Sequence, residues 1–145
     1  MCFRYFFEKK YGISPPVDTE AVDMAEIVSI VDAQFPKAEK WFSDGEYKLA
    51  PFNEYQRFLH WNQVDKRLYI KEFYDCDDFS FQLMGDIQIP GWSALAFGIL
   101  WTDVPGGGHA VNFFIDTNRD VWIVEPQSDS IFRMPKDWTE YLVII

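Results

Sequence analysis

The sequence has few cysteines, few basic residues and no long apolar run. Only two of its 145 residues are cysteines, Cys2 and Cys76. No apolar run approaches the roughly 20 residues that cross a bilayer. Residues 1–10 lack the basic-then-apolar order of a signal peptide. These absences exclude a disulfide framework and a membrane-spanning protein, and they predict a cytoplasmic protein with free thiols.

Positive charge is also scarce. Lysine and arginine number 13 against 23 aspartate and glutamate residues, and the formal net charge is −10. Such a surface repels nucleic-acid phosphates and anionic membranes, so we expect neither as a partner. The acidic surplus fits a cation site or a basic partner. Nothing in the sequence indicates an organic cofactor.

Aromatic and apolar residues are plentiful by contrast. The chain is 48% hydrophobic and 19% aromatic. This composition and length predict a single domain over residues 1–145 with one well-filled core.

The pattern along the chain predicts helices first and strands later. Helical spacing and capping residues predict helices over 18–35, 53–64 and 75–85, with Asp75 as the cap of the last. Residues 67–74 alternate and suggest an extended segment. Alternating or apolar runs predict strands over 93–102, 109–116 and 121–126, and further strands over 130–134 and 141–145. The order predicts an α+β fold, with a mainly helical part over 1–66 and the Cys76 helix plus an antiparallel sheet over 67–145.

Cys76 is the first candidate for chemistry. A helix N-terminus favours a thiolate, and Cys76 follows the predicted cap Asp75. The flanking carboxylates Asp77 and Asp78 oppose this effect, because they raise the pKa of the thiol. A bound cation or a protonated histidine nearby would ease that conflict. Cys76 taken alone is equally well explained as an inert, buried thiol.

His109 and Glu125 together are the second candidate for chemistry. They lie at the start of one predicted strand and the end of the next, with the turn at about Thr117. A tight hairpin therefore makes them cross-strand neighbours, so that Glu125 can orient the imidazole. His60 lies in a predicted helix and is assigned a packing or surface role. Gln56 and Gln63 could donate a hydrogen bond to an oxyanion, but neither lies shortly before Cys76 in the sequence. The oxyanion donor is therefore left open.

Three short strings carry a resemblance to a known family: residues 74–79 (YDCDDF), 108–112 (GHAVN) and 122–127 (WIVEPQ). They resemble the papain-like domain at the C-terminus of the fungal agglutinin of the Marasmius oreades type. The resemblance implies a papain/transglutaminase-like fold, with N-terminal helices packed on a C-terminal antiparallel sheet. It also implies Cys76 as nucleophile, His109 as base and Glu125 as the orienting acid.

The same resemblance implies a Ca²⁺ site, with Mn²⁺ as a substitute. By position its ligands would be Asp77, Asp78 and Gln127, which offer the hard oxygen atoms that Ca²⁺ prefers. Asp77 and Asp78 can equally be first-turn acids that favour the helix dipole. The agglutinin's sugar-binding domain has no counterpart in this chain.

Together these features predict a cysteine-dependent hydrolase or acyl-transfer enzyme acting on an amide bond of a protein or peptide substrate. One alternative is a non-enzymatic binding domain that keeps the fold and a cation site, in a phage or other mobile-element protein. A peptidoglycan amidase is a third possibility, which the missing export signal disfavours.

Overall fold

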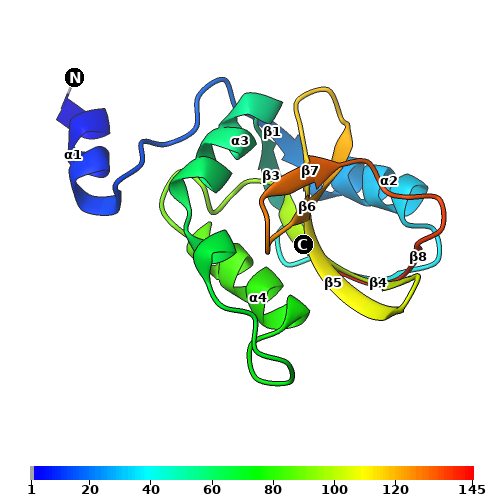
Figure 1. Ribbon diagram of the computed structural model, residues 1–145. Helices are drawn as coiled ribbons and strands as arrows, with labels where there is room; N and C mark the ends of the chain where they lie inside the picture. The colour runs from blue at the N-terminus through cyan, green and yellow to red at the C-terminus, as the bar shows by residue number, and fades with distance from the viewer. Residues whose placement is uncertain (1) are drawn as a thin grey trace.

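A mixed β-sheet forms the centre of the molecule (Figure 1). The computed structural model describes the backbone of residues 2–145 and the side chains of residue 6 and residues 8–145. Within this part the main sheet has six strands in the order β2-β8-β4-β5-β6-β7, and every neighbouring pair is antiparallel except β2–β8. The strands are β2 Glu39–Trp41, β4 Phe97–Val104, β5 Gly107–Ile115, β6 Val121–Glu125, β7 Ser130–Phe132 and β8 Thr139–Ile144.

Helices cover both faces of this sheet, and the pattern of β5 shows why. Val111, Phe113 and Ile115 pack with residues of α2 (Met24–Gln34). Phe114 of the same strand packs into a second cluster with residues of α3 (Phe52–Trp61) and α4 (Cys76–Asp86). A strand buried on both faces needs apolar residues at successive positions, which explains the continuous apolar run of β5.

Helix α3 is fixed to the sheet by one aromatic residue in particular. The ring of Tyr55 stacks on Phe114 with 3.9 Å between ring centroids. Its buried hydroxyl donates a hydrogen bond to the carbonyl of Ile115 at 3.0 Å. Burial strongly raises the pKa of Tyr55, so the hydroxyl stays protonated and available as a donor.

The α+β class is confirmed, while several predicted details need correction. The helix predicted over 18–35 begins at Met24, and residues Glu20–Asp23 form β1, which pairs with β3 (Glu46–Leu49). Asp23 caps α2 by accepting a hydrogen bond from the backbone of Glu26 at 2.9 Å. The part over 1–66 therefore carries three strands beside its helices, and the main sheet includes one parallel pair.

The remaining segments are short. Helix α1 (Cys2–Tyr11) precedes β1, and the 3₁₀ helix η1 (Val64–Lys66) follows α3. Residues 67–74, predicted as extended, instead form a turn that the Ile70–Tyr74 bridge closes. Across residues 2–145, no helix has the length and apolar character to cross a membrane. The side chain of Cys2 lies outside the described residues.

Candidate functional site

The β5–β6 hairpin brings His109 and Glu125 together. Its ladder pairs Asn112 with Val124. Continuing this register places Val111 opposite Glu125, so His109 and Glu125 are diagonal neighbours on one face of the sheet. The Nε2 atom of His109 lies 2.7 Å from Oε2 of Glu125. The predicted meeting of these two side chains is confirmed, and Glu125 holds the imidazole in one orientation.

Cys76 is the first residue of α4, as predicted. Asp75 caps the helix, and Oδ2 of Asp78 accepts a hydrogen bond from the Asp75 backbone at 3.1 Å. The backbone N–H of Ala110 acts on the Cys76 thiol and lowers its pKa. Since Ala110 follows His109 in β5, the start of α4 lies against the strand that carries the histidine.

The electrostatic surroundings of Cys76 disfavour a thiolate. Burial is the largest influence and raises the pKa of the thiol, and the charges of Asp75 and Asp77 raise it further. The Ala110 N–H opposes these effects without reversing them. The conflict expected from the sequence is therefore present in the structure.

Two carboxyl groups meet beside this thiol. Asp75, Cys76 and Asp77 place one potential ligand atom each within 4.8 Å of one another. A hydrogen bond with Asp75 raises the pKa of Asp77 and lowers that of Asp75. A proton or a cation satisfies such a pair.

The three predicted metal ligands do not all lie in this group. Asp77 belongs to it, whereas a carboxylate oxygen of Asp78 is engaged at the helix cap. The backbone N–H of Gln127 donates to Oε1 of Glu125 at 3.2 Å. The structure thus groups Asp77 with Asp75 and Cys76, and the metal-binding roles of Asp77, Asp78 and Gln127 stay predictions.

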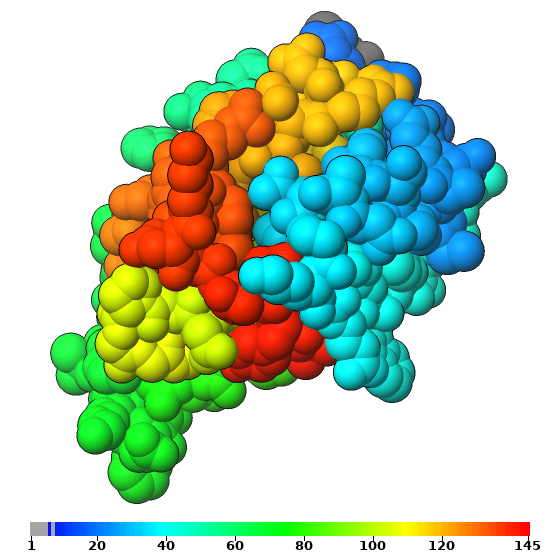
Figure 2. Space-filling model, turned by 90° about the vertical axis from the view of Figure 1, so that its right-hand side faces the viewer, coloured from blue at the N-terminus to red at the C-terminus, as the bar shows by residue number. Residues whose placement is uncertain are grey.

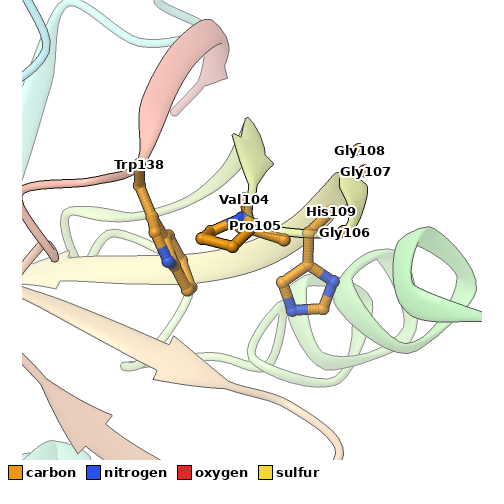
Figure 3. Close-up of a pocket in the computed structure, with 7 residues that line it drawn as sticks. All are labelled: Val104, Pro105, Gly106, Gly107, Gly108, His109 and Trp138. Atoms are coloured by element: carbon orange, nitrogen blue, oxygen red, sulfur yellow. The ribbon is translucent and has the colours of Figure 1, made fainter.

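An open hollow of about 490 Å³ lies beside His109. Figure 3 shows Trp138 and His109 at its walls, with Pro105 drawn between them. The two rings meet edge to face with centroids 6.0 Å apart. Gly106 and Gly107 have positive φ and open space where a Cβ would stand, so a ligand can approach the backbone closely. No sequence pattern marks Trp138 as a site residue, because it reaches the hollow from the segment before β8.

The turn between η1 and α4 is a second exposed feature near Cys76. It projects away from the sheet in both orientations (Figure 1; Figure 2, green). Four of its large apolar side chains are exposed, and Phe73 and Leu68 most of all, at 83% and 78%. Burial raises the pKa of Tyr69, and the charges of Asp75 and Cys76 raise it further. Because these two groups act on Tyr69, the turn borders the Cys76 end of α4.

Known proteins resemble this chain in structure rather than in sequence. No protein-family model and no curated protein matches the sequence. A solved PSL1a–E64 complex matches with a TM-score of 0.74 and 21% identity, over 86% of this chain and 51% of that one. Polyporus squamosus lectin bound to the human-type influenza-binding epitope Neu5Acα2-6Galβ1-4GlcNAc matches with a TM-score of 0.72 and 21% identity, over 86% and 49%. The chain thus shares their fold and spans about half the length of each.

These matches correct the assignment made from the sequence. One of the solved proteins that share the fold is described as a lectin, and the papain-like cysteine-peptidase family is not supported. The same matches correct two further predictions, namely the cysteine-dependent hydrolase or acyl-transfer function and the protein or peptide substrate. The catalytic roles of Cys76, His109 and Glu125, the papain/transglutaminase-like type of the fold and the single domain over 1–145 stay predictions.

Proposed function

We propose that this chain is a carbohydrate-binding domain, with its ligand site in the hollow between His109 and Trp138. The observation that carries the proposal is this hollow on the fold of the lectin chains. Because this chain spans about half the length of each matched chain, the proposal depends on the chemistry of the hollow itself. That chemistry suits a sugar, since an aromatic wall and a few fixed polar groups are what a small-ligand site requires.

Each wall of the hollow has a separate role. The Trp138 indole offers a flat apolar face to the C–H groups of a sugar ring. His109 offers a ring nitrogen to a hydroxyl group, and Glu125 fixes the orientation of that nitrogen through the 2.7 Å contact. The backbone at Gly106 and Gly107 is open to further hydroxyl groups, because no side chain covers it.

Replacing Trp138 tests the proposal. The chain is screened against immobilised glycans, including the epitope bound by the Polyporus lectin, and any hit is measured by calorimetry. We expect Trp138→Ala to weaken binding at least about tenfold, since an aromatic contact contributes about 1 kcal/mol beyond its buried area. Trp41→Ala is the matched control, because Trp41 is a 63% exposed tryptophan on the edge strand β2.

Two outcomes would contradict a carbohydrate-binding role. One is a folded chain that binds no glycan at millimolar concentration, and the other is Trp138→Ala binding as the wild type does. E64 is a useful second probe, since it occurs in a complex with PSL1a. Reversible binding in the hollow agrees with a binding domain. Permanent attachment of E64 at Cys76 would contradict the proposal, because it would show that the Cys76 thiol is reactive.

We also propose that a divalent cation, Ca²⁺ or Mn²⁺, binds beside Cys76. The support is the carboxyl pair Asp75 and Asp77, whose oxygens are hard ligands close enough to share one ion. Asp78 stabilises this geometry by capping α4. A cation here would offset the repulsion between the two carboxyl groups. Calorimetry with Ca²⁺ and with Mn²⁺ measures the binding, and Asp77→Asn should weaken it because a charged ligand is lost.

A further inference from the structure

The turn between η1 and α4, residues 67–74, gathers exposed apolar side chains at one place. Of the ten large apolar side chains described as exposed, four lie within this turn: Leu68, Tyr69, Ile70 and Phe73. The turn projects from the body of the molecule, so water surrounds these side chains (Figure 1; Figure 2, green). Gathered apolar side chains on a surface are typical of a site that contacts a partner or a membrane.

The backbone of the turn holds these side chains outward. The N–H of Ile70 donates to the carbonyl of Tyr74 at 2.9 Å, and the N–H groups of Phe73 and Tyr74 donate to the carbonyl of Ile70 at 3.0 and 2.7 Å. The ring of Tyr74 packs on Phe79 of α4, with 4.7 Å between the ring centroids. Backbone groups that are already bonded to one another lose little when they leave water. The turn can therefore enter an apolar medium without unfolding.

Positive charge surrounds the apolar side chains. Lys66, Arg67 and Lys71 are exposed, and Glu72 is the one carboxylate between residues 66 and 74. In the described part of the chain, neither Arg67 nor Lys71 forms an ion pair. Long cationic side chains lay their apolar stems along an apolar layer while their charged ends reach its polar border. The turn thus combines an apolar tip with a cationic rim, in a chain whose net charge is −10.

A groove of about 300 Å³ lies within the turn. Its lining residues are Arg67, Leu68, Ile70 and Tyr74. The guanidinium group of Arg67 lies 5.7 Å from the centre of the Tyr74 ring, which holds it at the groove. One guanidinium group beside apolar walls suits a phospholipid, because the phosphate pairs with the guanidinium and the acyl chain meets the walls.

We propose that this turn inserts into the surface of a zwitterionic phospholipid bilayer, with Leu68 and Phe73 entering the apolar layer and Arg67 contacting lipid phosphates. Shape favours a bilayer over a protein, since a stable protein interface takes about 20–30 residues a side and the projecting turn has eight. Charge favours zwitterionic lipid, because the acidic remainder of the chain is repelled by an anionic surface. The turn shares no lining residue with the hollow at His109, so this proposal is independent of carbohydrate binding.

Co-sedimentation with vesicles tests the proposal. One set of vesicles is pure phosphatidylcholine, and a second set also contains phosphatidylserine. We expect the chain to bind the first set, and we expect phosphatidylserine to leave the binding unchanged or to weaken it. Replacing Leu68 and Phe73 together by serine should lower the partition coefficient at least about tenfold, because the apolar area that enters the bilayer is lost.

Phe6→Ser is the matched control. Phe6 is a phenylalanine with 70% of its surface exposed, but it lies in α1, away from the turn (Figure 1). This variant should bind vesicles as the wild type does, and far-ultraviolet circular dichroism confirms that each variant is folded.

Three results would overturn the proposal. The first is a wild-type chain that does not bind phosphatidylcholine vesicles, or a folded Leu68→Ser, Phe73→Ser variant that binds them equally well. The second is binding that requires phosphatidylserine, since charge rather than apolar insertion would then drive it. The third is a dimer in sedimentation velocity that the double variant loses while no vesicle binds, which would assign the turn to a second copy of the chain.

Discussion

Gly98 is the position where the smallest substitution should cost the most stability. It lies in β4, and a Cβ there would stand 2.4 Å from the carbonyl oxygen of Ile144 and 2.6 Å from the ring of Phe113. Phe113 is fully buried and Ile144 O belongs to the backbone of the adjacent strand, so neither can move cheaply. Overpacking of this kind typically costs 1–3 kcal/mol. We expect Gly98→Ala to cost about 3 kcal/mol, because both contacts are far below van der Waals distance.

Thermal and urea unfolding measure this effect. For a chain of this size a loss of about 3 kcal/mol lowers the melting temperature by roughly 6–12 °C. Gly85→Ala is the control, since Gly85 lies in α4 and has open space at its Cβ position. It should raise stability by up to about 0.8 kcal/mol through helix propensity. A melting temperature of Gly98→Ala within about 2 °C of the wild-type value would contradict this packing effect.

Two further predictions concern buried polar groups. Tyr55→Phe should lower the free energy of unfolding by about 1 kcal/mol, because the buried carbonyl of Ile115 loses a donor at 3.0 Å; an unchanged urea midpoint would contradict this. Burial and the charge of Asp65 raise the pKa of Asp129 from 3.8 to about 6. A raised folded-state pKa means that the contribution of Asp129 to stability is fully present below its unfolded value and is lost as the pH rises through about 6. In chelator-containing buffer, the wild type should therefore lose about 1 kcal/mol relative to Asp129→Asn between about pH 5 and pH 7.5, after allowance for solvent screening of this half-buried side chain. A pH-independent difference in urea stability between the two proteins would refute this assignment.

The parts of the site that sequence predicts well depend on local signals. The start of α4 follows from a capping aspartate before Cys76, and the structure has the helix begin there. The meeting of His109 and Glu125 follows from a hairpin with a short turn, since neighbouring strands fix which residues face each other. In both cases the deciding residues lie close together in the chain.

The parts that sequence missed depend on contacts between distant segments. Trp138 joins His109 because β8 pairs with β4 rather than with its neighbour in the chain, β7. The predicted helix over 18–35 includes Glu20–Asp23 because Val22 fits the helical spacing of the apolar residues that follow. Val22 is the one buried residue of this segment, and that burial suits a strand equally well. Its pairing with β3 decided the outcome.

The papain-like family predicted from three short strings was wrong, and for a different reason. Short strings around Cys76, His109 and Glu125 suggest a peptidase, and the structure does bring His109 to Glu125 and Cys76 to the backbone of Ala110. A set of residue types does not by itself fix the chemistry, because the reactivity of a cysteine depends on its thiol pKa. Burial and two flanking carboxylates raise that pKa here, which a list of residue types does not reveal.

The place of β8 between β2 and β4 has a consequence for how the chain is made. β2 has only three residues, and β8 is its partner in the sheet, more than ninety positions later in the chain. A ribosome that adds about 5–20 residues per second delivers β8 well after β2, so β2 waits several seconds for its partner. During that time the edges of β2 and β4 are open to other nascent chains. A chaperone that shields unpaired edges should therefore raise the yield of this protein more than it raises the rate at which purified chains refold.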